Sequence, residues 1–402
     1  MPEAPMQPAY RWTIVFAAAL ILAVSMGAIV NGMSAFLVPM QERFGWHRGE
    51  AALINFAGIV GLAFGGVVWG RLADRIGARP IVIFGTIALG LCYLAASVLT
   101  SLWQYYAVFA VAGFLGAGAI FAPVLALVGN WFVTGAGLAI GIVSAGQALG
   151  QGGVPYVSSF LIQAYGIQGA LGVTGAFMLA VMTPLAFLMR PAPARSGTST
   201  VAGLDAENPP IAYDVVIVRM SAAVVLCCTC MSVPLMHLVP LIQDVGFPAE
   251  EASSVIFAMM ISAILGRVAF GKLADVIGAV PAYMAATAWM TVMVLGFVRL
   301  ESLNVFYVYA IVYGFGYSGV MTGVLTSVRA LAPVEHRSSA MGIIGMFAWF
   351  GHAIGGYQGG LLHDLTGSYD LPYALAAAAG VLNLVIVGTL LRRIRGPRPA
   401  IA

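Results

Sequence analysis

Two nearly identical eight-residue segments, 201 positions apart, divide this chain into two similar halves. They read Gly-Arg-Leu-Ala-Asp-Arg-Ile-Gly at 70–77 and Gly-Lys-Leu-Ala-Asp-Val-Ile-Gly at 271–278. Each lies between long apolar runs, and six such runs repeated in the same order are typical of transporters built from parallel repeats. The same offset relates further residues of the two halves: Pro39/Pro240, Gly45/Gly246, Glu50/Glu251, Pro80/Pro281, Gly113/Gly314, Gly118/Gly319, Gly141/Gly342 and Gly150/Gly351.

The composition places most of this chain in lipid. Apolar residues make up 61% and charged residues 8% of its 402 residues, which excludes an ordinary soluble domain. Helices are expected because a backbone in hydrocarbon satisfies its own hydrogen bonds, and the apolar runs are too long for barrel strands. Runs of about 20 residues, long enough to cross a bilayer, predict an all-α membrane protein with twelve transmembrane helices, at 12–38, 50–69, 80–100, 103–128, 136–162, 168–189, 215–242, 252–270, 281–299, 304–328, 338–362 and 372–391.

The basic residues predict how the chain lies in the membrane. With the N-terminus inside, Arg43, Arg48 and Arg299 fall outside and Arg267 falls within a span. The other fourteen of the eighteen Lys and Arg residues are then cytoplasmic, as the positive-inside rule requires. Both termini are therefore predicted to be cytoplasmic. Short loops and the lack of a cleavable signal peptide favour a multi-pass protein of a prokaryotic inner membrane.

The connection between the sixth and seventh predicted spans marks a domain boundary. Residues 190–213 are rich in Pro, Ala, Ser, Thr and Gly, which is typical of a flexible linker. We expect two six-helix bundles, residues 1–189 and 214–402, related as parallel repeats on either side of this cytoplasmic linker.

The spans contain no set of residues suited to catalysis or to metal binding. Cys92, Cys227, Cys228 and Cys230 all fall inside predicted helices, where we interpret them as small buried hydrophobes. We therefore expect no enzyme activity, no cofactor and no metal. The net charge of +3 follows from the cytoplasmic excess of Lys and Arg and indicates no nucleic-acid partner. The lipid bilayer and a small solute are the expected partners; the oligomeric state stays open, with a monomer as the expectation.

The repeated segments at 70–77 and 271–278 are predicted to do more than connect spans. Their glycines permit a tight cytoplasmic turn. Asp74 can accept hydrogen bonds from nearby arginines, such as Arg71 and Arg75, or from the N-terminus of a neighbouring helix. A turn alone requires no aspartate, yet the second segment has an aspartate, Asp275, at the position equivalent to Asp74. We interpret these four residues as a conformational latch; the alternative is a well-formed turn.

Several motifs resemble a known family. The two eight-residue segments and the twelve spans in two halves resemble the major facilitator superfamily over essentially the whole chain. Within it, Phe44-Gly-Trp-His-Arg-Gly-Glu50, Asn130-Trp-Phe132 and Gly360-Leu-Leu-His-Asp-Leu-Thr-Gly-Ser-Tyr369 look like the monocarboxylate transporters and their bacterial relatives, including the oxalate/formate exchangers. The resemblance implies the major facilitator fold and transport by alternating access at the interface of the halves.

Arg267 is the one fixed charge predicted inside a span, because all fifteen carboxylates and the only lysine, Lys272, fall in loops or at span ends. Such a charge is costly unless it faces a cavity and meets an anion. Its counterpart is Gly66, whereas a structural role would more naturally be duplicated. A snorkelling arginine is the alternative, but helical side chains tilt toward the helix N-terminus, here toward the midplane. The monocarboxylate transporters carry their carboxylate anchor at this spacing before Gly271, so the resemblance implies that Arg267 binds substrate.

The charge balance predicts the class of substrate. One guanidinium binds one carboxylate through two hydrogen bonds, which favours a small monoanion such as lactate, pyruvate or acetate. The oxalate/formate exchangers place a lysine in span eleven as a second cation, and no span here contains a lysine. Animal monocarboxylate transporters carry a lysine in span one and an aspartate in span eight, where this chain has Asn31 and Ala263. Asn31 is therefore included among the predicted substrate contacts.

Other polar residues in the spans are candidates for binding and proton coupling. His237, in the outer part of span seven, and His352, near the centre of span eleven, can titrate near neutral pH, and His237 can also contact substrate. The alternative is a neutral, hydrogen-bonded histidine, and the substrate carboxylate can itself carry the proton. Tyr313 and Tyr317, four residues apart on span ten, can offer hydroxyls to a carboxylate, although packing explains them equally well.

These features predict a secondary active transporter of a small monocarboxylate, with proton symport implied by the resemblance. The alternative is an organic anion exchanger of the oxalate/formate type. A non-transporting membrane receptor or assembly subunit is a third hypothesis, which the short loops and the lack of a soluble domain oppose.

Overall fold

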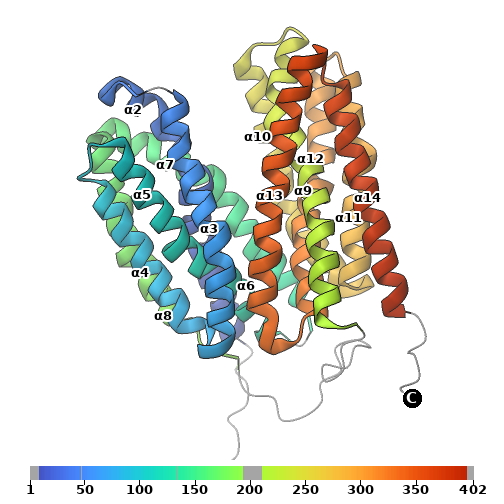
Figure 1. The fold of residues 1–402 in the computed structure, drawn as a ribbon, viewed down its shortest axis with the longest axis horizontal. Helices are drawn as coiled ribbons and strands as arrows, with labels where there is room; N and C mark the ends of the chain where they lie inside the picture. The colour runs from blue at the N-terminus through green and yellow to red at the C-terminus, as the bar shows by residue number, and fades with distance from the viewer. Residues whose placement is uncertain (1–8, 47, 133, 193–210, 396–402) are drawn as a thin grey trace, which may run out of the picture. The chain divides into compact units, whose positions relative to one another are not determined.

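The computed structural model describes residues 9–46, 48–132, 134–192 and 211–395, and within these ranges all regular secondary structure is helical (Figure 1). The first half contains α1 (Tyr10–Met26), η1 (Gly27–Asn31), η2 (Gly32–Phe36), α2 (Leu37–Phe44), α3 (Arg48–Ile76), α4 (Ala78–Ala96), α5 (Leu102–Val111), η3 (Ala112–Ala117), α6 (Gly118–Trp131), α7 (Ala136–Phe177), η4 (Met178–Met182) and α8 (Thr183–Phe187). The second half contains α9 (Tyr213–Asp244), α10 (Ala249–Ile277), α11 (Ala279–Val294), η5 (Leu295–Arg299), α12 (Leu303–Leu331), η6 (Val334–His336), α13 (Arg337–Thr366) and α14 (Asp370–Arg395).

The predicted spans are confirmed as helices. Ten helical runs of the described chain are long and apolar enough to cross a membrane. One of them, Ala136–Phe187, has 52 residues, about 78 Å of helix, which is more than twice the thickness of a bilayer core. Gly166 divides it, with φ 70° and ψ 179°, into two spans. The ten runs therefore contain eleven spans, and α13 is the twelfth. It has 30 residues, is rich in glycine and carries His352.

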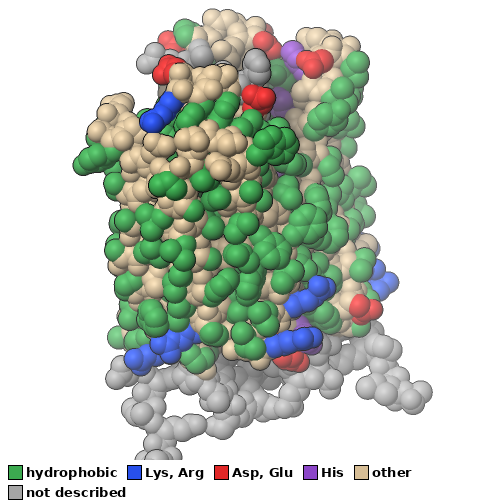
Figure 2. Space-filling model, turned by 60° about the vertical axis from the view of Figure 1, so that its left-hand side comes forward, with side chains coloured by type: hydrophobic (Ala, Val, Ile, Leu, Met, Phe, Trp, Pro, Cys, Tyr) green, Lys and Arg blue, Asp and Glu red, His purple; other side chains and the backbone are tan. Residues whose placement is uncertain are grey.

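The surface agrees with a position in the membrane. On the face seen in Figure 2, hydrophobic side chains cover the middle of the molecule, and most Lys and Arg side chains in view gather near its lower edge. We call the side that the basic residues predict to be cytoplasmic the inner side, and the opposite one the outer side.

The prediction that 70–77 and 271–278 are turns is wrong for most of their length. Helix α3 continues to Ile76 and α10 to Ile277. The reversal into the next helix takes one residue each time, Gly77 at φ 91° and Gly278 at φ 96°, a region that favours glycine. The backbone N–H of Gly77 still donates to the carbonyl of Ala73, which extends the helix to the reversal. The aspartates therefore lie on rigid helix ends.

The two halves use the same packing. Helix α3 packs against α5, η3 and α6, and α10 packs against α12, so the second and fourth spans of each half are neighbours. A Cβ on Gly113 would overlap the carbonyl of Gly58, and one on Gly314, its counterpart, would overlap that of Met259, 201 residues after Gly58. Small residues thus permit close contact between spans in both halves, as is common in membranes.

The chain separates into two compact units, each described here by itself. Unit 1 comprises Met1–Val133, Ile142–Gly197 and Val334–Met346, and unit 2 comprises Thr134–Gly141, Thr198–Pro333 and Phe347–Ala402. The first residues of α7 thus belong to unit 2 and those of α13 to unit 1. The domain boundaries predicted from sequence stay a prediction, and most of the predicted linker, residues 193–210, lies outside the described residues.

The first span is interrupted near its middle. Its α-helix changes into the π-helical η1 and then the 3₁₀-helical η2. Side chains of neighbouring helices bond to the carbonyls there: the Tyr93 hydroxyl donates to the carbonyl of Ala28 at 2.9 Å, and the Asn55 amide donates to that of Val30 at 3.0 Å. Such interruptions often mark functional positions in helices.

Candidate functional site

Arg267 lies within α10 of unit 2, ten residues before its last residue, about 15 Å along the axis from the inner end of the helix. Its side chain is partly buried. The backbone at this position is closely packed, because a Cβ on Gly141 would lie 2.6 Å from the Arg267 carbonyl. The same close packing occurs in unit 1, where Gly342 meets the carbonyl of Gly66. The duplicated positions therefore share a backbone contact and differ in side chain.

Tyr317 lies near Arg267. It belongs to α12, the helix along which α10 packs, and the two side chains are close enough to interact electrostatically. Tyr317 is 5% exposed and stacks on Tyr313, with ring centroids 5.6 Å apart. Tyr313 is fully buried, and its hydroxyl has no hydrogen-bond partner in the described chain. The structure thus groups three of the predicted substrate residues on two neighbouring helices.

Asn31 lies in unit 1, at the last position of the π-helical segment η1 of the first span. Its side chain is exposed, and its carbonyl accepts a hydrogen bond from the Ser34 hydroxyl at 2.7 Å. Whether Asn31 contributes to one site with Arg267 stays a prediction.

His237 belongs to a polar cluster at the outer side of unit 2. One ring nitrogen, Nε2, lies 2.8 Å from the Gly356 carbonyl, and the ring lies 5.6 Å from that of Tyr369. On its other side, Tyr369 stacks on His363 with centroids 4.3 Å apart. His363 in turn pairs with Asp244 at 3.4 Å. The His363–Tyr369 hairpin motif therefore meets the end of α9, a contact that the sequence reasoning missed.

His352 is placed differently from His237. It lies in α13, and its Nδ1 is 3.0 Å from the carbonyl of Ala348, one turn earlier in the same helix. Its ring also lies 5.8 Å from that of Trp349. The Nε2 of His237 contacts the Gly356 carbonyl, which lies one turn after His352 along α13. In the described chain the two histidines make no direct hydrogen bond to each other.

The two latch aspartates make equivalent contacts. In unit 1, Asp74 accepts hydrogen bonds from the backbone N–H groups of Ser338 at 3.0 Å and Ser339 at 2.8 Å, at the start of α13. In unit 2, Asp275 accepts from the N–H groups of Gly137 at 2.7 Å and Leu138 at 2.9 Å, at the start of α7. Each carboxylate thus caps a helix N-terminus, where unpaired N–H groups and the helix dipole favour an anion.

The arginines that flank Asp74 are exposed to solvent or lipid. Arg71 and Arg75 are both exposed on the last turns of α3. A third hydrogen bond reaches Asp74 from the Ser339 hydroxyl instead. The sequence analysis did not identify Ser338 and Ser339 as partners of Asp74. They lie 201 residues after Gly137 and Leu138, and this offset is the signal in the sequence that relates the two caps.

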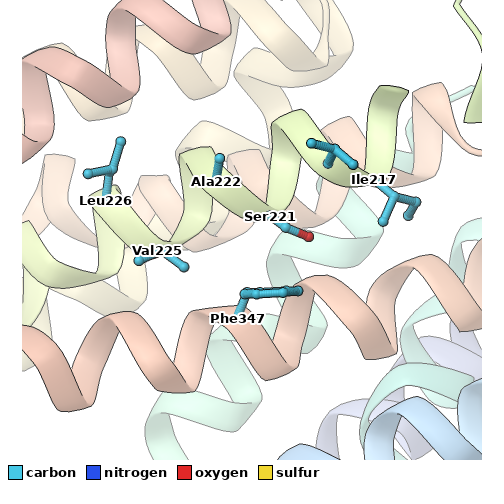
Figure 3. A pocket seen from close by; sticks show the side chains of 7 residues that line it. Ile217, Ser221, Ala222, Val225, Leu226 and Phe347 are labelled. Carbon is cyan, nitrogen blue, oxygen red and sulfur yellow. The ribbon is translucent and has the colours of Figure 1, made fainter. Parts of the chain in front are cut away.

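An apolar pocket of about 500 Å³ lies between α9 and α13 in unit 2 (Figure 3). It contains none of the predicted substrate residues and no charged side chain, so its chemistry does not suit a carboxylate. Its lining consists of Ile217, Val218, Ser221, Ala222, Val225, Leu226 and Phe347. Among the described residues, no group of three or more His, Cys, Asp or Glu side chains is arranged to hold a metal ion.

Comparison with known proteins gives a consistent result. Monocarboxylate transporter 13 of Rattus norvegicus is 28% identical over 383 residues, which cover 93% of this chain and 87% of that protein. Monocarboxylate transporter 4 of the same species is 24% identical over 391 residues, covering 94% and 82%. The human organic anion transporter MFSD10 superposes with a TM-score of 0.76 at 14% identity, covering 95% of this chain and all of that one. The proton:xylose symporter XylE superposes with 0.75 at 12% identity, covering 96% and 97%.

These matches confirm the resemblance to monocarboxylate transporters and the prediction that the chain is a transporter and not an enzyme. The family described as Major Facilitator Superfamily matches residues 15–238 and 220–402, nearly the whole chain. Twelve helical spans, repeated packing in two halves and two capped helix starts related by one offset fit that family. This multi-pass integral membrane protein belongs to the major facilitator superfamily.

Proposed function

We propose that this chain carries a small monocarboxylate, of the lactate, pyruvate or acetate type, across the membrane together with a proton. The observation that carries the proposal is Arg267: a permanent cation deep in a transmembrane helix, beside the Tyr317 hydroxyl. A guanidinium in such a place is stabilised by an anion, and a carboxylate matches its two-donor geometry. The names of the relatives with 24–28% identity support the same substrate class.

The proposed site places each residue in a role. Arg267 forms the ion pair with the carboxylate, and Tyr317 donates a hydrogen bond to it. Tyr313 stacks on Tyr317 and fixes the orientation of its ring. Asn31 is the proposed contact from the first span, where interrupted helices commonly bind solutes.

Proton coupling is the second part of the proposal. A bound monoanion neutralises the charge of Arg267. When a proton then binds the carboxylate, the ion pair is lost and the substrate leaves as the neutral acid. His237 and His352 are the candidate proton acceptors within the helices, and His237 is also a candidate substrate contact. Of the two, His237 adjoins the outer cluster of Tyr369, His363 and Asp244.

The latch residues act on the conformational equilibrium and not on the site. We propose that Asp74 and Asp275 stabilise one conformation of the transporter by capping α13 and α7, with Arg71 and Arg75 adding positive charge on the inner side. The proposed carrier works as a monomer with both termini cytoplasmic. A prokaryotic inner membrane stays a prediction from the sequence, because the relatives named above are mammalian.

Uptake by proteoliposomes tests the proposal. Radiolabelled lactate, acetate, formate and oxalate are offered with and without a pH gradient, alkaline inside. Faster uptake of lactate or acetate under the gradient supports monocarboxylate symport. Uptake in exchange for preloaded oxalate, at a rate that does not depend on the pH gradient, would identify an anion exchanger instead. No uptake of any of the four compounds would reject the substrate class.

A further inference from the structure

Two tyrosines in the interior of unit 2 differ from the other buried tyrosines. Tyr313 of α12 and Tyr373 of α14 are both fully buried, and neither hydroxyl has a hydrogen-bond partner in the described chain. By contrast, Tyr93 bonds to a backbone carbonyl and Tyr283 bonds to Asn383 at 2.6 Å. A buried hydroxyl that lacks a partner is unfavourable, because it has given up its hydrogen bonds to water.

The two tyrosines pack on the same side chain. Both rings pack on Phe297, with centroids 5.0 Å away for Tyr313 and 6.3 Å for Tyr373, and the two tyrosines are within electrostatic range of one another. The buried Cys230 thiol is also within electrostatic range of Tyr313. A buried water typically bonds to several polar groups that are otherwise unsatisfied, and this pair provides two of them.

The pair lies in a row of aromatic hydroxyls. Toward the outer side, Tyr373 adjoins Tyr369, with ring centroids 6.2 Å apart, and Tyr369 is partly exposed. Toward the middle of the membrane, Tyr313 stacks on Tyr317, which is in electrostatic range of Arg267. The row therefore runs from the hairpin after α13 to the cation of the proposed substrate site.

Histidine and aspartate side chains lie at the outer end of the row. His363 stacks on Tyr369 and pairs with Asp244 at 3.4 Å and Asp364 at 3.9 Å. His237 approaches the same tyrosine from α9. These groups can collect a proton from solvent, whereas beyond them the row consists of neutral hydroxyls until Arg267.

We propose that water bound at the Tyr313 and Tyr373 hydroxyls links the row into a proton path from this outer cluster to the carboxylate bound at Arg267; the proton role rests on the symport proposed above. At each step an oxygen accepts a proton from its outer neighbour and passes its own proton inward, so no oxygen keeps a charge. The last acceptor is a carboxylate oxygen. The substrate becomes the neutral acid, and its ion pair with Arg267 is broken.

Hydroxyl-radical footprinting by X-ray radiolysis tests the water directly. Side chains beside bound water are oxidised even when they are buried, so Tyr313 and Tyr373 are expected to react several-fold faster than Tyr283. Tyr283 is the matched control, since it is equally buried and its hydroxyl is bonded to Asn383. Equal rates for the three tyrosines would overturn the proposal.

Transport by single-hydroxyl variants tests the path. Tyr313→Phe and Tyr373→Phe are expected to slow lactate uptake driven by a pH gradient about tenfold, because a proton donor or acceptor contributes at least that much. The lactate affinity of Tyr373→Phe, measured by thermal shift, should match that of the wild type, because Tyr373 is not part of the proposed binding site. Tyr309→Phe is the control, because that hydroxyl bonds to the Met293 carbonyl at 2.6 Å, outside the row.

The outcomes separate this proposal from the proposed function. Wild-type uptake driven by the gradient, together with full activity of both Phe variants, would reject the path and leave symport in place. Loss of lactate affinity in Tyr373→Phe would also reject it, as general damage to the site. If no monocarboxylate responds to a gradient in the wild type, symport and the proton role both fail, and footprinting then decides only whether the pair holds water.

Discussion

Asp74 holds Ser339 by two hydrogen bonds, one from the backbone N–H at 2.8 Å and one from the side-chain hydroxyl. The equivalent residue in the other half, Leu138, offers Asp275 its backbone N–H alone, at 2.9 Å. The two caps are therefore alike in backbone geometry and unequal in strength.

Neutralising the caps should shift the conformational equilibrium and leave the binding site intact. Asp74→Asn replaces a charged acceptor, and we expect a loss of about 1–3 kcal/mol from the conformation described here. The transport cycle should slow because return to that conformation is less favourable, while substrate affinity stays within about threefold. Asp275→Asn should have the smaller effect, since its cap has one bond fewer. Uptake rates and binding titrations measure both quantities.

Exchanging the residues opposite the carboxylates provides a sharper test. Ser339→Leu should weaken the first cap, and Leu138→Ser should strengthen the second, so the two changes are expected to act in opposite directions. Glu301→Gln, at an exposed residue between η5 and α12, is the control and should change neither rate nor affinity. If Asp74→Asn abolished binding in a folded protein, the latch interpretation would be wrong.

Arg267→Lys keeps the charge and removes the two-donor fork, so affinity for the best monocarboxylate should fall about ten- to hundredfold. Arg267→Ala should fold at least as stably as the wild type, because it removes a costly charge from the membrane, and should not transport. Thermal shift with and without substrate separates folding from binding. Near wild-type affinity in the lysine variant would exclude Arg267 as the anchor.

A site with one cation should reject dianions, because the second negative charge has no partner. Oxalate is therefore expected to compete poorly with lactate in the wild type. A lysine introduced in α13 at Trp349 or His352 should increase the relative affinity for oxalate about tenfold or more, if it supplies one charge-assisted hydrogen bond. Phe347→Lys is the comparison, since Phe347 lines the apolar pocket against α9. Strong oxalate competition in the unmodified protein would favour the exchanger.

Close contact between the first and fifth spans should make Gly150 intolerant of a side chain. A Cβ there would overlap the carbonyl of Ala23, whereas one on Gly152 or Gly153 meets nothing within 4 Å. We expect Gly150→Ala to destabilise the protein by about 1–3 kcal/mol through overpacking. Gly152→Ala and Gly153→Ala should be neutral or slightly stabilising, since both lie in a helix. Thermal unfolding of the three variants in one detergent makes the comparison.

The fold was predictable because its information is local and repeated. Each apolar run is long enough to specify a helix, and the constant offset between the halves identified the duplication without any spatial knowledge. The ends of α3 and α10 were not predictable: glycines in 70–77 permit a turn, but Gly70 serves close packing, since a Cβ there would meet the backbone of Ser338. Local rules do not reveal that contact.

The candidate site was predictable only in part, for the same reason. Arg267 is conspicuous because charge is rare in the spans, and Tyr313 and Tyr317 are one helical turn apart in the sequence. The partners of Asp74 lie 264 and 265 residues away, and Tyr373 is related to Tyr313 through Phe297, on which both rings pack. No spacing rule identifies pairs at such separations.

The glycine contacts at the duplicated positions bear on how the two halves came to differ. Gly342 touches the main chain of Gly66, and Gly141 touches the main chain of Arg267, so neither contact depends on the side chain of its partner. A substitution at 66 or 267 therefore left the helix crossing undisturbed. The two halves can therefore differ in chemistry at this position while they keep the same helix crossing.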